Sequence, residues 1–202
     1  MDESLQRGFT LYELLVTVVV MGVILSIGVP NFLEITRNNR MAAASNDLLT
    51  AFTLARSEAV KRKLPVTVCA SADPAAEAPL CGGTFAEGWV IFADANGDIR
   101  IDPGEEIIRS GGPIPGGITL QTNAGANYFS YAGTGAGRGD IGGSPSLRGA
   151  LLCDVRGNVP SAGGRVSAAR ALRIEAPGRP IVVREIALVN NVAITLVGAD
   201  CP

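Results

Sequence analysis

The feature that most constrains this chain is an apolar run near its start, "GFTLYELLVTVVVMGVILSIGVPNF" at residues 8–32. From Phe9 to Val29 it has 21 residues, which span about 30 Å as a helix and match the hydrocarbon core of a bilayer. One full negative charge, Glu13, lies near the beginning of the run. An unpaired carboxylate inside a membrane costs on the order of 3 kcal/mol. The run therefore predicts a membrane-spanning helix, and Glu13 in it needs an explanation.

Two interpretations of Glu13 stay open. In the first, the carboxylate lies at the headgroup level, because Glu13 is only four residues from Phe9. In the second, the chain is cleaved after Gly8, and the new α-ammonium of Phe9 on an identical neighbour pairs with Glu13. A buried charge that only a neighbouring subunit can neutralise favours one register in an assembly. We favour the second interpretation.

The position of the run excludes an ordinary secretory signal. In such signals the apolar run precedes the cleavage site and is removed, whereas here Gly8, the residue a peptidase could accept, stands in front of the run. A kink or break is expected at Pro30. The predicted segments are a leader at 1–8, a transmembrane or filament-core helix at 9–30, an amphipathic continuation at 31–64 and a β-rich globular domain at 65–202.

The continuation of the helix is predicted from its period. Leu48, Phe52, Ala55 and Ala59 are spaced four, three and four residues apart and form one apolar stripe. The basic residues at 61–63 suit a helix C-terminus, and Pro65 stops the helix. We expect the stripe to pack on a sheet.

Short apolar or β-branched runs fill the rest of the chain, separated by glycine-rich connectors, and predict antiparallel sheets. The fold class expected is α+β, with a long N-terminal helix packed by its second half on antiparallel sheets. The runs are 66–70, 89–93, 99–101, 106–109, 117–121, 127–131, 150–155, 171–176, 181–186 and 192–197.

The cysteines predict an oxidising compartment. Cys69, Cys81, Cys153 and Cys201 lack the paired spacing of a zinc site, and an even number in a strand-rich domain favours two disulfides. Four cysteines allow three pairings, of which we favour the sequential one, Cys69–Cys81 and Cys153–Cys201. This places the bulk of the chain outside the cytosol.

The segment 88–109 carries two possible structures. Asn96-Gly97 between apolar runs is a strong hairpin signal. The spacing of nearby oxygen-bearing residues also approaches that of a calcium loop, but Ile99 stands where such a loop needs glycine. We favour the hairpin and expect no metal. The weak calcium candidates are Asp94, Asn96, Asp98, Asp102 and Glu105.

Several of these motifs carry a family resemblance. Gly8-Phe9-Thr10-Leu11, with Glu13 at the fifth position after the cut, resembles the class III signal of type IV pilins and type II secretion pseudopilins. Tyr12 stands where isoleucine or valine is more usual. The glycine-tryptophan strand, the F-x-D-x-N-G turn and D-P-G-E-x-x-x-R within 88–109 resemble the GspH/FimT group, as do R-S-E-A-V-K-R (56–62) and V-T-V-C (66–69).

The resemblance implies a structural and assembly subunit. A prepilin peptidase would cut between Gly8 and Phe9 and methylate the new N-terminus of Phe9. The protein would be inserted in the inner membrane with its C-terminal domain in the periplasm, and would then join other pilins at or near the tip of a type II secretion pseudopilus or a type IV pilus. We expect no cofactor.

The alternative function is DNA uptake through C-terminal arginines. Residues 110–202 hold eight arginines against five acids, and phosphate contacts need well-placed cations. The G-R-x-R motif of DNA-binding members is incomplete, because Ile181 replaces its second arginine. An enzyme is not expected, since the chain has no histidine. The candidate DNA contacts are Arg165, Arg170, Arg173, Arg179 and Arg184.

Overall fold

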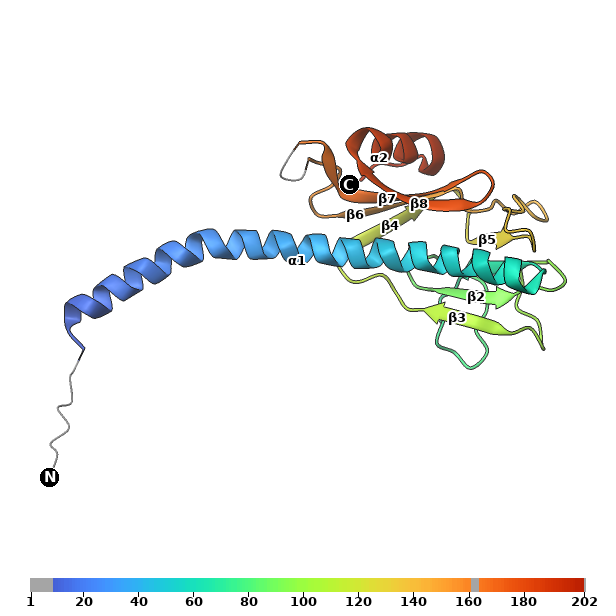
Figure 1. Ribbon diagram of the computed structural model, residues 1–202, viewed down its shortest axis with the longest axis horizontal. Coiled ribbons are helices and arrows are strands. Elements are labelled where there is room, and N and C mark those ends of the chain that lie inside the picture. Colours follow the sequence, from blue (N-terminus) through green and yellow to red (C-terminus); the bar gives the residue numbers. More distant parts are fainter. Residues whose placement is uncertain (1–8, 161–163, 202) are drawn as a thin grey trace, which may run out of the picture. The chain divides into compact units, whose positions relative to one another are not determined.

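The computed structural model describes residues 9–160 and 164–201. The chain divides between Asn39 and Arg40 into two compact units, and each is described by itself. Helix α1 (Leu11–Arg62) begins in the first unit and ends in the second. Figure 1 draws it as one unbroken ribbon.

In the first unit, α1 carries the apolar run. Within residues 9–160 and 164–201, α1 is the one helix long and apolar enough to cross a membrane, by length and composition. The break considered at Pro30 does not occur, because Pro30 lies inside the helix. Proline removes one backbone donor, and the next residue, Asn31, donates from Nδ2 to the carbonyl of Ile27 at 3.1 Å.

In the second unit, the C-terminal part of α1 supplies one face of the core. The predicted stripe is confirmed: Leu48, Phe52, Ala55 and Ala59 are buried. The alanines in this stripe leave room for strands to approach the helix closely. The helix ends as expected at Arg62, and Lys63 adopts φ 59° before Pro65.

The first sheet, sheet A, has the strand order β3-β2-β1-β5, and all its pairs are antiparallel. Strand β1 is central, pairing Val66–Ala70 with Ala93–Trp89 of β2 and Val66–Cys69 with Tyr131–Tyr128 of β5. The strands are β1 (Val66–Ala70), β2 (Trp89–Ala93), β3 (Ile107–Gly111) and β5 (Tyr128–Tyr131).

The second sheet, sheet B, has the order β4-β6-β7-β8 and is also antiparallel. The pairing of β7 with β8 shifts register between Val166 and Ala171, so β7 bulges there. The strands are β4 (Ile118–Thr122), β6 (Gly149–Asp154), β7 (Val166–Glu175) and β8 (Arg179–Glu185).

Sheet B lies between two apolar layers. One of its faces joins the main core with α1, where Leu152 and Leu172 are buried in the same cluster as Phe52. The other face is covered by helix α2 (Ile186–Val192) and the π-helix η1 (Ala193–Val197). Figure 1 shows α2 on the side of sheet B away from α1.

The strand predicted at 192–197 is wrong, because this segment is helical in η1 and continues α2. Its buried residues repeat with a helical period, at Val189, Val192, Ala193 and Val197. The β-branched residues of this segment suggested a strand. The segment instead covers the face of sheet B, and a helix with one apolar side can pack on that face.

The strand predicted at 99–101 is also wrong. Residues 94–106 form a loop between β2 and β3, so the two strands pair as an antiparallel hairpin without the two-residue turn at Asn96-Gly97. Ile99 adopts a left-handed conformation, φ 64°, which is strained for a β-branched residue and interrupts extended geometry.

Candidate functional site

The N-terminus of α1 is closed by a reciprocal cap between Thr10 and Glu13. The backbone N–H of Thr10 donates to Oε2 of Glu13 at 3.0 Å, and the N–H of Glu13 donates to Oγ1 of Thr10 at 3.2 Å. The Thr10 hydroxyl also donates to the same carboxylate at 2.9 Å. This is a capping box, which satisfies two backbone donors at a helix start. Glu13 is therefore hydrogen-bonded within its own chain.

The predicted processing site is only partly visible. Gly8 lies outside the described residues, and Phe9 precedes the cap with its side chain 84% exposed. The cap uses the N–H of the Phe9–Thr10 peptide, which a cut between Gly8 and Phe9 would leave intact. A cleaved chain can thus keep the capping box while it gains an α-ammonium on Phe9.

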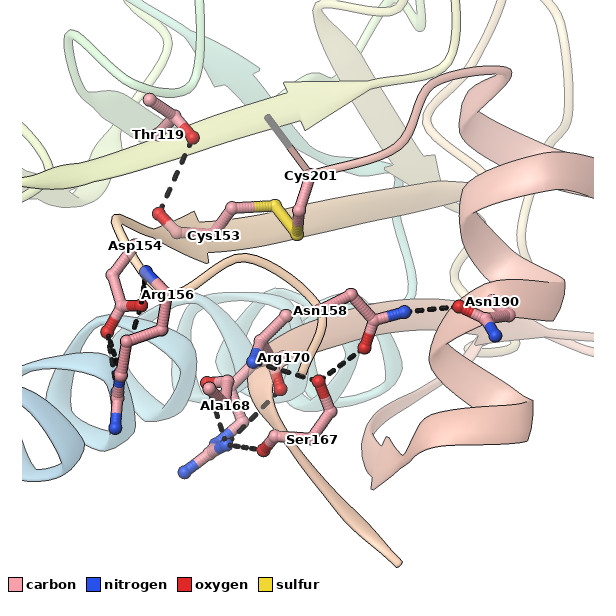
Figure 2. The surroundings of a disulfide bond; sticks show 11 residues. Thr119, Cys153, Asp154, Arg156, Asn158, Ser167, Ala168, Arg170, Asn190 and Cys201 are labelled. Atoms are coloured by element: carbon pink, nitrogen blue, oxygen red, sulfur yellow. Dashed lines mark hydrogen bonds and ion pairs between the residues drawn. A yellow bond between two sulfur atoms is a disulfide. The ribbon is translucent and has the colours of Figure 1, made fainter. Parts of the chain in front are cut away.

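The four cysteines form two disulfides, in the pairing favoured from the sequence. Cys69 bonds Cys81, and Cys153 bonds Cys201. The first bond joins β1 to the loop that follows it. The second joins β6 to the segment after η1 and so holds the C-terminal helices over sheet B (Figure 2).

The loop 94–106 uses its acidic side chains to hold its own backbone. Glu105 accepts hydrogen bonds from the N–H groups of Ala95 and Asp102, at 2.9 and 3.1 Å. Oδ2 of Asp102 accepts from the Asn96 side chain at 2.8 Å. In the described part of the chain these residues do not gather into a metal-binding group. The regular spacing of these oxygen-bearing residues therefore reflects hydrogen bonds within the loop.

A buried polar cluster at the start of this loop was not foreseen. Asp94 has no exposed surface. Its Oδ2 accepts from the Thr67 hydroxyl at 2.6 Å and lies 3.7 Å from Nη1 of Arg138. Arg138 also donates to the carbonyl of Gly97 at 3.0 Å. One signal in the sequence could have indicated it. Asp94 directly follows a run of apolar strand residues, and a carboxylate buried there needs a hydrogen-bonding or charged partner.

The five candidate DNA-contacting arginines do not form one face. Arg170 lies opposite Leu152, which belongs to the core on the α1 side of sheet B. Arg173 lies opposite Ile181, which packs on the α2 side. Opposed residues in an antiparallel pair share a face, so these two arginines point in opposite directions.

The surroundings of the candidate arginines differ as well. Arg170 is only 2% exposed, and Arg173 pairs with Glu175. Arg165, Arg179 and Arg184 are exposed, with Arg179 opposite Glu175 across the β7–β8 pair. A continuous track of phosphates needs aligned free cations, and this arrangement does not provide one.

Comparison with known families identifies the class of protein. A family described as type II transport protein GspH matches residues 44–178, which is about two thirds of the chain. A prokaryotic N-terminal methylation motif matches residues 4–29. The chain therefore belongs to the GspH family of pilins and pseudopilins.

Individual relatives are more distant. The chain is 34% identical over 103 residues to the pilin-like protein PilA1 of Thermus thermophilus, covering 50% of this chain and 56% of that protein. It thus spans little more than half the length of this curated relative. Among solved structures it is similar to the type IV minor pilin FimU of Pseudomonas aeruginosa, with 16% identity, TM-score 0.46, and coverage of 74% of this chain and 92% of FimU.

Proposed function

We propose that this protein is a minor pilin or pseudopilin subunit, cut between Gly8 and Phe9, methylated on Phe9, and assembled at or near the tip of a type II secretion pseudopilus or type IV pilus. Residues 9–30 would anchor it in the inner membrane before assembly, with the C-terminal domain in the periplasm. Family membership and the methylation motif support the class.

The observation that carries the mechanism is Glu13, one carboxylate in an otherwise apolar stretch at the start of α1. Its present partner is Thr10 of its own chain. After cleavage, the α-ammonium of Phe9 on a neighbouring subunit is a stronger partner, because both groups carry a full charge. Pairing sets the axial register while the apolar helices pack together.

The test separates the charge of Glu13 from its capping role. Glu13→Gln removes the charge but keeps a side chain that can complete a capping box. Thr10→Val removes the hydroxyl but keeps the charge. Each full-length variant is expressed beside the intact filament machinery, and its amount in sheared filaments is measured relative to its amount in membranes.

We expect Glu13→Gln to lower incorporation at least tenfold, since a buried charge without its partner costs about 3–5 kcal/mol. Thr10→Val should assemble close to the wild-type level. Mass spectrometry should find all three chains beginning at methylated Phe9, which shows that processing was not the step affected. Normal incorporation of Glu13→Gln, or equal loss in both variants, would contradict the charge-pair mechanism.

A further inference from the structure

The side chain of Arg170 is buried at the bulge in β7. It is 2% exposed, and Figure 2 shows its guanidinium turned back on its own strand. Nη1 donates to the carbonyls of Ser167, Ala168 and Ala169, at 3.1, 3.3 and 3.2 Å. The residues described in the structure accept no hydrogen bond from Nε or Nη2. Nε and Nη2 form the side of a guanidinium that can bind a carboxylate with two parallel hydrogen bonds.

The positive charge of Arg170 also lacks an ion pair at contact distance within the described residues. No carboxylate in residues 9–160 or 164–201 lies within 4.0 Å of it. The nearest acid by placement, Asp154 on β6, already pairs with Arg156 at 2.5 Å. Burial, and then the charges of Arg184 and Arg156, lower the pKa of Arg170 to about 10, and the charge of Asp154 opposes them only in part. A buried cation whose nearby acid is already paired with another arginine is unfavourable.

A second arginine faces the same place. Arg184 lies on β8 between Val183, which opposes Ala171, and Glu185, which opposes Val166. It is therefore directly across from the bulge. Val183 packs against α2 and Val182 against α1, so alternation turns Arg184 to the α1 side of sheet B, the side of Arg170. Arg184 is exposed.

We propose that Arg170 and Arg184 form an oxyanion slot, and that the carboxylate of an Asp or Glu on an adjacent pilin subunit fills it. Arg170 supplies the paired donors, Nε and Nη2, and Arg184 supplies a flexible donor at the mouth of the slot. The identity of the occupant rests on the proposed function, whereas the slot itself rests on the geometry of β7 and β8.

The surroundings favour one protein carboxylate over a nucleic acid. Asp154 follows Leu152 by two residues on β6 and so lies on the same side of sheet B as the slot, and it would repel a polyanion. Arg173 and Arg179 point to the face of sheet B that α2 covers. They therefore cannot extend a phosphate track from the slot, which is on the other face. A single planar carboxylate needs only the two donors of Arg170 and one of Arg184.

The slot can be tested on the unassembled full-length protein in a non-ionic detergent. With ¹⁵N-arginine labelling, inorganic phosphate is titrated at constant ionic strength, balanced with chloride, and the Nε–Hε resonances are followed. We expect the Arg170 resonance to shift saturably. Arg184→Ala should weaken phosphate binding about tenfold, as expected for loss of one charge-assisted hydrogen bond. Arg179→Ala, on the opposite face, should bind as the wild type does.

Two results would contradict the slot. In the first, the Arg170 resonance shows no saturable shift; in the second, wild type and Arg184→Ala bind phosphate equally. Arg170→Met should bind no phosphate, and if it does not fold, Arg184→Ala still decides the question. A short DNA duplex is titrated in parallel. Tighter binding of the duplex than of phosphate, weakened equally by Arg179→Ala and Arg184→Ala, would overturn the carboxylate assignment in favour of a nucleic-acid face.

The occupant is tested in cells with Arg184→Glu, which should reduce incorporation into filaments by repelling the partner carboxylate. If phosphate binds but this variant assembles normally, the subunit carboxylate is the wrong occupant. If instead Glu13→Gln assembles normally while the phosphate result holds, the proposed function fails and the slot stands.

Discussion

At the scale of single residues, the indole of Trp89 lies directly against the backbone of Gly111 in sheet A. The two residues oppose each other across β2 and β3, and Trp89 is 1% exposed. A Cβ added to Gly111 would lie 2.2 Å from Cε2 of the indole. The missing side chain therefore lets the tryptophan lie flat across the neighbouring strand, where the guanidinium of Arg109 is 5.8 Å from its ring centre.

Gly111→Ala should lower the free energy of unfolding by about 1–3 kcal/mol, the usual cost of overpacking a core. Urea unfolding followed by tryptophan fluorescence measures this on the one tryptophan in the chain. The control is Gly112→Ala, where a Cβ meets no atom within 4 Å, and where a change of less than about 0.5 kcal/mol is expected. Equal effects of the two substitutions would exclude the steric explanation.

Which residues could be predicted from sequence depends on the range of their interactions. Glu13 stood out because its apolar neighbours are adjacent in the chain. The Asp94 cluster could not be predicted, since its partners Thr67 and Arg138 come from segments 27 and more residues away. The same holds for Arg170, which is buried at a bulge that no local pattern reveals.

At the scale of elements, one arginine joins the end of α1 to the start of β3. Arg62 donates to Glu58 at 2.7 Å and forms two hydrogen bonds with Glu106, at 2.6 and 2.9 Å. These bonds lower the pKa of both carboxyls below the ordinary 4.5. A carboxyl with a lowered pKa stabilises the fold above that value, and its contribution is lost as the pH falls through the pKa of the folded state.

Arg62→Met should therefore flatten the acid side of the stability profile. The free energy of unfolding of the wild type should fall as the pH drops below about 4.5, and that of the variant should fall less steeply over the same range. The two curves are obtained by urea unfolding at a series of pH values. Arg100→Met is the control, because no ion pair of Arg100 occurs within the described ranges. A slope identical to that of the wild type would contradict the bridge.

The second disulfide should contribute most to sheet B. The bond between Cys153 and Cys201 closes a loop of 48 residues, for which the chain-entropy model gives about 4 kcal/mol. Cys201→Ser should lower stability by roughly this amount in oxidising buffer. With a reductant present, variant and wild type should unfold alike. Equal loss under both conditions would mean that packing of the Cys201 side chain, and not the bond, is responsible.

Strand positions were easier to predict than the C-terminal helices. Strands β1 and β2 were predicted with their observed bounds, because both are all-buried runs between turn residues. Helix α2 and η1 contain β-branched residues that favour strands locally. Their helical form depends on the shape of the sheet face beneath, which is a property of the fold and not of the segment.

At the scale of the whole molecule, the core belongs entirely to the second unit. The buried residue of the main core that comes first in the chain is Met41, just after the division between Asn39 and Arg40. The sequence predicted four segments, a leader at 1–8, a transmembrane or filament-core helix at 9–30, an amphipathic continuation at 31–64 and a β-rich domain at 65–202, with the continuation packed on a sheet. In the second unit, the buried residues of α1 from Met41 to Ala59 belong to the same core as the sheets.

A chain that starts at Arg40 should therefore fold as the full-length protein does. We expect its thermal unfolding midpoint to agree with that of the full-length protein in non-ionic detergent to within a few degrees, since about 1 kcal/mol shifts Tm by only 2–8 °C. Circular dichroism provides the measurement. A chain that starts at Leu49 is the control, and it should lose the transition because Met41, Ala44 and Leu48 are missing from the core. Failure of the longer chain to fold would contradict the division into units.

The positions of the two disulfides also imply an order of events in time. Cys69 and Cys81 are 12 residues apart, whereas Cys201 follows Cys81 by another 120 residues. At a synthesis rate of about 5–20 residues per second, that interval lasts about 6–24 s. The first bond can thus form while the last strands have not yet been made. Sheet B, in contrast, cannot receive its covalent closure before Cys201 has been made.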